Sequence, residues 1–290
     1  MSPRIGVCSW SLQPRSVDEL VQRVQAVGVS AVQLALDPLR AGEWSIDQTV
    51  ARLQRAEIEI RSGMIGMPGE DYSTLESIRR TGGVRLAEHW EANLANAGAS
   101  AELARRINVG LVTFHAGFLP HERSDPSRKV MIDRLRAIID RLAAQDVAVG
   151  LETGQETAET LLDVLDELDR PEVGVNFDPA NMILYGMGDP VAALRKLAPR
   201  VVQIHVKDAR ASETPATWGT EVPAGGGEVD WSAFFEAVRA ARLRCDLMIE
   251  REAGRDRVAD IRQAYELLKR LLGSQGQPNN GPGKQRSAPA

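Results

Sequence analysis

Short apolar runs alternate along the chain with longer stretches in which apolar residues recur every three or four positions. The short runs predict buried strands, and the longer stretches predict helices with one apolar face. The predicted strands are Ile5 to Cys8, Ala31 to Leu36, Ile58 to Ile65, Val109 to His115, Val147 to Glu152, Val173 to Asp178, Val201 to Asp208 and Asp246 to Glu250. Eight strand-helix units in about 270 residues favour an α/β fold of the closed (β/α)8 type, with an open doubly wound sheet as the alternative.

Local signals refine this pattern. Ser16 and Glu19 have the spacing of a capping box, in which each side chain accepts from the other residue's free backbone N–H. Asp189 precedes a proline and is typical of a helix start. A further helix is predicted over 83–106. Residues 66–72 form a polar loop rich in Gly and Pro that is too long for a simple connection, and this loop is a candidate lid.

The domain organisation follows from the same pattern. A dinucleotide-binding open sheet requires a Gly-x-Gly-x-x-Gly turn after an early strand, but residues 8–12 read Cys-Ser-Trp-Ser-Leu. We therefore expect one TIM barrel over residues 1–272. Residues 273–290 contain Gly, Pro, Asn, Gln and Ser without an aliphatic run, which predicts a disordered C-terminal tail.

Charge and composition exclude several classes of partner. The net charge of -5 and the lack of a Lys/Arg run argue against nucleic acid and against an anionic membrane surface. The sequence shows neither a signal-peptide pattern nor a span of about 18 apolar residues, so a cytoplasmic protein is expected. Cys8 and Cys245 fall near opposite ends of the first and last predicted strands, beyond disulfide reach, and are expected to be buried thiols.

Four consecutive predicted strands, the fifth to the eighth, each end in a side chain that binds metals or carries protons. These are Glu152, Asp178, His205 and Glu250. Strand ends at the C-terminal face of a barrel lie side by side, so the four side chains are expected to converge. Three carboxylates and one imidazole suit one divalent metal ion, Mn²⁺, Mg²⁺ or Co²⁺. Each residue alone is equally well explained as a cap or a salt-bridged strand end, but the coincidence of all four favours a shared site.

Motifs around these positions resemble the xylose isomerase-like TIM-barrel superfamily, which comprises sugar phosphate isomerases and epimerases. The motifs are Gly-Leu-Glu-Thr at 150–153, Asn-Phe-Asp-Pro-Ala-Asn at 176–181, His-Val-Lys-Asp at 205–208, Gly-Gly-Glu-Val-Asp-Trp at 226–231 and Ile-Glu at 249–250. The resemblance covers residues 4–272. It extends to ketose 3-epimerases, hydroxypyruvate isomerases, inosose dehydratases and, more distantly, enzymes of the endonuclease IV type.

The resemblance implies that Glu152, Asp178, His205 and Glu250 hold the metal and that the two glutamates also form the catalytic acid-base pair. A divalent ion chelated by a ketone and its neighbouring hydroxyl lowers the pKa of the C–H between them and stabilises the resulting enediolate. One glutamate removes that proton, and the other returns one from the opposite face. The expected enzyme is an isomerase or epimerase that acts on a small keto-sugar or sugar phosphate through a metal-bound enediolate.

One departure from the family pattern keeps a second reaction open. Many ketose epimerases carry a histidine three residues after the metal aspartate, where this chain has Asn181, which hydrogen-bonds a hydroxyl but does not titrate. The His-x-Lys-Asp motif, with Arg210 following, is closer to the inosose dehydratase branch. Elimination of water from a keto-polyol by a lyase is therefore the alternative activity.

Further residues are expected to contact the carbohydrate substrate. Lys207 follows the metal histidine by two positions in a strand, so it should point the same way and bind a substrate oxygen. Asn181 and Arg210 are candidates on the grounds just given. His115 and Trp10 each end a predicted strand, and each is equally well explained as a buried structural residue.

Several alternatives stay open from the sequence. Residues 225–227, three glycines before a predicted helix, form either a phosphate cradle or a plain turn. A nuclease of the endonuclease IV type is disfavoured by four histidines and a sequence pI of about 5.6, and a non-catalytic sugar-binding barrel is the remaining class. Barrels of this kind often associate, so a homo-oligomer also stays open.

Overall fold

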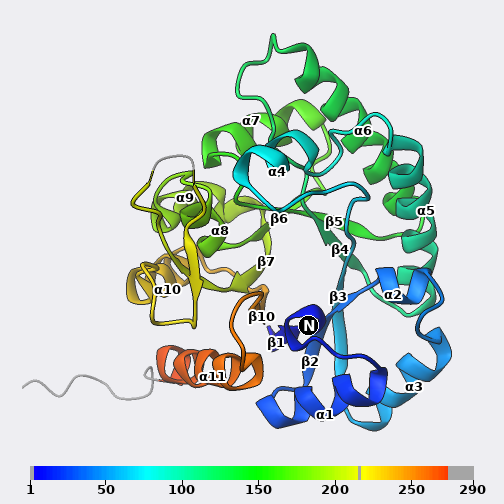
Figure 1. Ribbon diagram of the computed structural model, residues 1–290, viewed down its shortest axis with the longest axis vertical. Helices are drawn as coiled ribbons and strands as arrows, with labels where there is room; N and C mark the ends of the chain where they lie inside the picture. Colours follow the sequence, from blue (N-terminus) through cyan, green and yellow to red (C-terminus); the bar gives the residue numbers. More distant parts are fainter. Residues whose placement is uncertain (1–2, 215–216, 274–290) are drawn as a thin grey trace, which may run out of the picture.

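The computed structural model describes residues 3–214 and 217–273, and within them eight parallel strands close into a barrel. Figure 1 shows these strands around the centre of the molecule with the helices outside them. The barrel strands are β1 (Ile5–Cys8), β2 (Ala31–Ala35), β3 (Glu59–Met64), β4 (Leu111–Phe114), β5 (Ala148–Glu152), β6 (Gly174–Phe177), β7 (Val201–Val206) and β10 (Asp246–Ile249). The barrel closes because β1 pairs with both β2 and β10.

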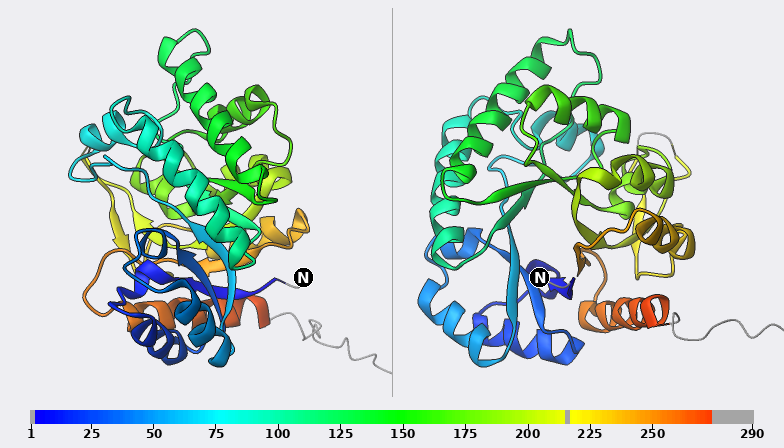
Figure 2. Two further views of the ribbon diagram at one scale, coloured as in Figure 1. Left: turned by 90° about the vertical axis from the view of Figure 1, so that its right-hand side faces the viewer. Right: turned by 180° about the vertical axis from the view of Figure 1, so that it is seen from behind.

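The helices cover the outside of the barrel, as both views in Figure 2 show. They are α1 (Val17–Val27), α2 (Asp37–Arg40), α3 (Ile46–Arg55), α4 (Leu75–Thr81), α5 (Trp90–Arg106), α6 (Pro126–Ala143), α7 (Ala158–Leu168), α8 (Pro179–Leu184), α9 (Pro190–Leu197), α10 (Trp231–Ala240) and α11 (Arg257–Gly273), with 3-10 turns η1 (Ser9–Leu12) and η2 (Ala198–Arg200). Their apolar faces pack on the strands to form one continuous core. In the described part of the chain, no helix has the length and apolar character needed to cross a membrane.

The closed barrel confirms the predicted TIM-barrel fold, and the open-sheet alternative is wrong. All eight predicted strands exist, and no strand end differs from the prediction by more than two residues. Both cysteines are free thiols, and Cys8 is buried as predicted, whereas Cys245 is only partly buried. The predicted tail begins at Gly273, which the structure shows as the last residue of α11, and residues 274–290 lie outside the described residues.

The capping predictions are confirmed in part. Asp189 caps α9 by accepting from Ala192 N at 2.6 Å. Ser16 Oγ accepts from Glu19 N at 3.3 Å, as a capping box requires. The predicted reciprocal hydrogen bond, from the backbone N–H of Ser16 to Glu19, is wrong, because the Glu19 carboxylate accepts from the backbone N–H of Arg15 at 2.7 Å.

The predicted helix over 83–106 is wrong in its first turns, because α5 begins only at Trp90. Gly83 has a φ of +62°, and a Cβ at this position would lie 2.1 Å from the backbone of Ala116. Val84 N then donates to Ala116 O at 3.2 Å. This close backbone contact keeps residues 82–89 in bends and turns instead of a helix, and it depends on a residue more than thirty positions away.

A two-stranded hairpin, β8 (Asp208–Arg210) and β9 (Thr220–Val222), follows β7. The three glycines predicted as a turn or phosphate cradle lie beside it and enclose the carboxylate of Asp208. Gly225 N and Gly227 N donate to Asp208 Oδ2 at 2.8 and 3.2 Å, and Trp231 Nε1 donates to the same oxygen at 2.9 Å. The anion held by this turn is therefore a side chain of the protein itself.

Candidate functional site

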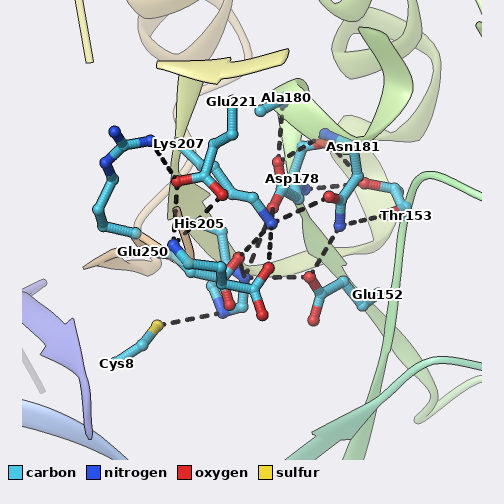
Figure 3. Close-up of polar contacts among 12 residues, drawn as sticks. Cys8, Glu152, Thr153, Asp178, Ala180, Asn181, His205, Lys207, Glu221 and Glu250 are labelled. Atoms are coloured by element: carbon cyan, nitrogen blue, oxygen red, sulfur yellow. Dashed lines mark hydrogen bonds and ion pairs between the residues drawn. The ribbon is translucent and has the colours of Figure 1, made fainter. Parts of the chain in front are cut away.

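The four strand-end residues predicted from the sequence meet in one buried cluster at the C-terminal end of the barrel. One ligand atom from each residue lies within 4.8 Å of the others, and all four side chains are buried. Figure 3 shows the carboxylates of Glu152, Asp178 and Glu250 directed toward His205 and Lys207. The predicted convergence is thus observed.

The carboxylate of Asp178 is positioned by the start of α8. Asp178 follows β6 and caps α8, with Oδ1 accepting from Ala180 N at 2.8 Å and from Asn181 N at 3.0 Å. The other oxygen, Oδ2, is buried and accepts no hydrogen bond. A buried carboxylate oxygen without a donor is the kind of group that a cation satisfies.

The imidazole of His205 has one nitrogen on each side of the cluster. Nδ1 lies 3.2 Å from Glu152 Oε1 and 3.3 Å from Glu250 Oε2. Nε2 lies 2.7 Å from Gln33 Oε1 on the side away from the carboxylates, where Cys8 is also found. With a metal bound and the Nε2 proton donated to Gln33, a neutral His205 would direct its Nδ1 lone pair toward the carboxylates, as a metal ligand requires.

Polar side chains fill the barrel interior below the cluster and were not predicted as part of the site. Asn176 Nδ2 donates to Glu152 Oε2 at 3.2 Å, and Gln203 Nε2 donates to Asn176 Oδ1 at 3.1 Å. Gln33 Nε2 donates to Thr113 Oγ1 at 2.7 Å. Strand alternation could have identified two of them, because Asn176 and Gln203 each precede a cluster residue by two positions and so face inward too.

Burial and neighbouring charges shift the pKa values of two acids of the cluster in opposite directions. Burial raises the pKa of Asp178 to about 7. Burial also acts to raise the pKa of Glu152, but the imidazoles of His115 and His205 outweigh it and hold that pKa below its usual value. Burial therefore disfavours the ionised form of Asp178, while the imidazoles favour the ionised form of Glu152. Opposite pKa shifts of neighbouring acids are a feature of catalytic sites.

Glu250 and Lys207 form a buried ion pair, with Nζ 2.9 Å from Oε2. Burial acts to raise the pKa of Glu250, but Lys207 and His205 hold it well below its usual value. Burial acts to lower the pKa of Lys207, but the surrounding carboxylates, Glu250 first, hold it well above its usual value. Both groups are therefore charged.

The ammonium of Lys207 points into the cluster, as the alternation from His205 predicts. Its Nζ donates to Asn181 Oδ1 at 3.1 Å, to Glu250 Oε2 at 2.9 Å and to Glu252 Oε2 at 2.8 Å. Glu252 was not predicted, although it follows Glu250 by two positions. A direct contact between Lys207 and substrate stays a prediction.

Three other predicted substrate residues lie at the cluster. Asn181 Nδ2 donates to Glu152 Oε1 at 3.1 Å. His115 Nε2 lies 3.7 Å from the same oxygen, and its Nδ1 is buried without a partner. Trp10 Nε1 donates to Glu250 Oε1 at 2.8 Å. Their contact with a substrate stays a prediction, as do the catalytic roles of the two glutamates.

Arg210 is not brought to the cluster. It lies on β8, it is exposed, and its guanidinium donates through Nε and Nη2 to Gly226 O at 3.1 and 2.9 Å. The hairpin thus directs this side chain along its own glycine turn, and the predicted substrate contact has no support from its position.

A cavity of about 350 Å³ opens above the cluster. It is lined by Trp10, Ala35, Asp37, Met64, Ile65, Gly66, Glu70, Tyr72, His115, Asn181, Leu184, Tyr185, Lys207, Trp218, Glu250 and Glu252. Its volume is at the lower end of the range of about 300–1,000 Å³ for ligand pockets, which suits a small molecule. A larger hollow of about 900 Å³ lies at the opposite, N-terminal end of the strands, around Glu59, Gly110 and Asp246. We assign the functional site to the smaller cavity because Glu250 of the titratable cluster and its partner Lys207 line it.

The cavity wall includes part of the loop predicted as a candidate lid. Gly66, Glu70 and Tyr72 of this loop line the cavity. Glu70 Oε1 accepts from Gly83 N at 2.9 Å, which ties the loop to the segment before α5. The loop therefore forms a wall of the site.

The donor set fits a divalent cation. Three buried carboxylates and one imidazole nitrogen can approach a single point, and Asp178 supplies an oxygen that accepts no hydrogen bond and lies 3.5 Å from Lys207 Nζ. Oxygen-rich sites of this kind suit Mg²⁺ and Mn²⁺. Cys8 also lies beside His205 and forms a second possible ligand group with His205 and Glu250, and burial raises the pKa of its free thiol to about 12.

A comparison with protein families gives one match over most of the chain. The family model described as Xylose isomerase-like TIM barrel matches residues 21–271. A comparison with curated proteins finds no match.

Solved structures with the same architecture are numerous. The chain is similar to a xylose isomerase domain protein from Planctomyces limnophilus, with 32% identity, a TM-score of 0.84, and coverage of 94% of this chain and 98% of that one. It is also similar to the probable 3-DHS dehydratase AsbF involved in petrobactin synthesis from Bacillus anthracis, with 20% identity, a TM-score of 0.69, and coverage of 92% and 98%. An L-ribulose 3-epimerase shares 16% identity at a TM-score of 0.73, with coverage of 95% and 100%.

The last two likenesses, below 25% identity, show the fold alone. The family match and the 32% identity over 94% of the chain confirm the resemblance read from the motifs. The chain belongs to the xylose isomerase-like TIM-barrel family.

Proposed function

We propose that this protein is a divalent-metal-dependent isomerase or epimerase that acts on a small keto-sugar through an enediolate. The observation that carries the proposal is the buried convergence of Glu152, Asp178, His205 and Glu250 within 4.8 Å at the floor of a small cavity. Family membership and the likeness to an L-ribulose 3-epimerase support this class of reaction.

The same four residues would hold the metal ion, with Mn²⁺, Mg²⁺ or Co²⁺ as candidates. When bound, such an ion polarises a carbonyl and makes the neighbouring C–H more acidic. His205 is prepared for ligation by its hydrogen bond to Gln33, and Asp178 by the backbone N–H groups at the start of α8.

The two glutamates are proposed to exchange protons with the substrate carbon. Glu152 accepts from Asn181 and Asn176, and Glu250 accepts from Trp10 and Lys207. These donors fix the orientation of both carboxylates, so that one can remove a proton and the other can return one. The 350 Å³ cavity limits how much water accompanies the substrate.

Elimination of water from a keto-polyol is the second candidate. Asn181 supports it, because this amide lies at the cluster where a titratable histidine would serve a second proton transfer. The fold-level likeness to a probable 3-DHS dehydratase is consistent with this reaction. Both candidates begin with removal of the proton next to the carbonyl.

Incubation with a panel of ketoses and inososes in heavy water, with Mg²⁺ or Mn²⁺ present, distinguishes the two reactions. Deuterium incorporation next to the carbonyl, without loss of water, supports isomerisation or epimerisation. A product lighter by one water supports elimination. If neither exchange nor elimination occurs with any carbonyl sugar, both reactions are rejected, and a non-catalytic sugar-binding barrel remains.

Substitutions of single residues test whether the two glutamates carry out the proton exchange. Glu152→Gln and Glu250→Gln are expected to abolish exchange, because an amide cannot accept the carbon-bound proton. Glu266→Gln, at an exposed position of α11, is the matched control and should retain full exchange. Retained exchange in both site variants would exclude the two glutamates as the acid-base pair.

A further inference from the structure

Carboxylates outnumber cations around the cavity. Among the described residues that line it, Glu70, Glu250 and Glu252 face a single cation, Lys207, while a fourth acid, Asp37, is paired with Arg40 at 2.6 Å. Two more carboxylates of the metal-binding cluster, Glu152 and Asp178, lie next to Glu250 but do not line the cavity. Counted together, the cavity and the cluster hold five carboxylates and one ammonium, so a divalent ion in the cluster would leave two negative charges, those of Glu70 and Glu252.

The one lysine has no donor left for an anionic ligand. An ammonium carries three N–H donors, and those of Lys207 are directed to Asn181, Glu250 and Glu252 at 2.8 to 3.1 Å. A phosphate or carboxylate could recruit Lys207 only by displacing buried carboxylates from it, which is costly.

Two arginines that are close in sequence to Lys207 and Glu250 are also engaged elsewhere. Arg210 donates to a carbonyl of the glycine turn. Arg251 is buried and paired with Glu221 at 2.7 Å and with Asp260 at 2.8 Å. Neither residue lines the cavity, so neither supplies the fork-shaped contact by which arginine binds phosphate.

The two carboxylates on the upper wall are fixed in place. Glu70 accepts from Gly83 N at 2.9 Å, and Glu252 is held by Lys207 through its side chain. The backbone N–H of Glu252 also donates to Glu221 Oε1 at 2.9 Å. Because these groups are anchored, they cannot swing away from an incoming anion.

Aromatic rings form much of the remaining wall. Trp10, Tyr72, Tyr185 and Trp218 line the cavity, although the whole chain has only five Trp and three Tyr. The rings of Tyr185 and Trp218 pack edge to face with centroids 5.0 Å apart. Flat aromatic faces pack against the C–H surfaces of a sugar ring, while carboxylates accept hydrogen bonds from its hydroxyls.

We infer that Glu70 and Glu252 determine specificity by selecting an uncharged sugar and rejecting sugar phosphates and sugar acids. The inference rests on the proposed function in taking a sugar as the ligand, and it narrows the substrate class of the same site. Each carboxylate accepts from substrate hydroxyls and repels a second negative charge.

Equilibrium binding tests this selection without turnover. The probes are D-glucitol and D-glucitol 6-phosphate, which lack a carbonyl, measured by calorimetry on the Mg²⁺-loaded full chain. Glucitol is expected to bind at least about tenfold more tightly than its phosphate at low salt, because like charges meet in the cavity. The difference should shrink between about 0.02 M and about 0.5 M salt, because the ions screen the repulsion.

The Glu70→Gln/Glu252→Gln double variant should bring the two affinities closer. The matched control Glu43→Gln/Glu122→Gln changes two exposed glutamates outside the cavity and should leave the difference unchanged. Equal or tighter binding of the phosphate by the wild type overturns the inference, as does a lack of glucitol binding.

Different results would refute the proposed enzymatic function and the proposed selection of an uncharged sugar. Selective glucitol binding without any exchange in heavy water rejects the enzymatic function and leaves the selection intact. Exchange that occurs only with a ketose phosphate supports the function and rejects the selection.

Discussion

Replacing Lys207 with methionine should weaken the fold and strengthen metal binding. The change keeps an unbranched side chain and removes the positive charge that lies 2.9 Å from Glu250 and 3.5 Å from Asp178. Removing one partner of a buried ion pair costs about 3–5 kcal/mol. The pair with Glu252, whose side chain is 53% exposed, adds less than about 1 kcal/mol.

A divalent ion should recover part of this loss, because it brings two positive charges to the same carboxylates. Recovery of about 2 kcal/mol corresponds to metal binding about 30-fold tighter in Lys207→Met than in the wild type. The unfolding free energy is measured by urea denaturation in chelator and in Mn²⁺, and metal affinity by equilibrium dialysis. Lys196→Met is the matched control, since Lys196 pairs with Glu159 on the exposed surface.

The Lys196→Met control should lose less than about 1 kcal/mol of unfolding free energy and should bind metal as the wild type does. Metal binding by Lys207→Met that is equal to or weaker than that of the wild type would refute the reasoning. It would show that the ammonium does not compete with the metal for these carboxylates.

Three further predictions concern residues around the site. Burial raises the pKa of Glu156 from 4.5 to about 8, so the folded state retains a proton that the unfolded chain loses. The wild type therefore loses stability as the pH rises from 4.5 to 8, and Glu156→Gln should be more stable by about 3 kcal/mol at pH 7 and unchanged near pH 4, as measured by urea unfolding. Asp208→Asn should cost about 3 kcal/mol in the same assay, since an amide cannot accept all the N–H groups that enclose the carboxylate, and a loss below about 0.5 kcal/mol would contradict this. Gln33→Leu removes the acceptor for His205 Nε2–H and should weaken Mn²⁺ binding about 10–100-fold in equilibrium dialysis, whereas Thr113→Val should not.

The sequence predicted the barrel and the cluster because both depend on short-range periodicity. Each of Glu152, Asp178, His205 and Glu250 ends an apolar run, and barrel closure then brings the ends together irrespective of loop length. The alternation that placed Lys207 beside His205 also applies to Asn176, Gln203 and Glu252, so these residues were predictable by the same rule.

Other features depend on contacts that no local pattern encodes. Gly83 departs from a helical path because the backbone of Ala116 lies against it. Arg210 points away from the site because the glycine turn offers it a carbonyl. Glu70 and Trp218 reach the cavity on loops whose course is set by such contacts, and periodicity gives no information about them.

The occupied glycine turn changes the interpretation of the His-x-Lys-Asp motif. His205, Lys207 and Asp208 are close in sequence, but His205 lies in the buried cluster, Lys207 lines the cavity, and Asp208 accepts the N–H groups of the turn. An N–H cradle that already holds a carboxylate cannot also bind a substrate phosphate without leaving Asp208 buried and unpaired. The glycine turn therefore holds Asp208, whereas Lys207, two positions after His205, is held by Glu250 and Glu252 at 2.9 and 2.8 Å. A negative charge on a substrate would meet Glu70 and Glu252, which line the cavity.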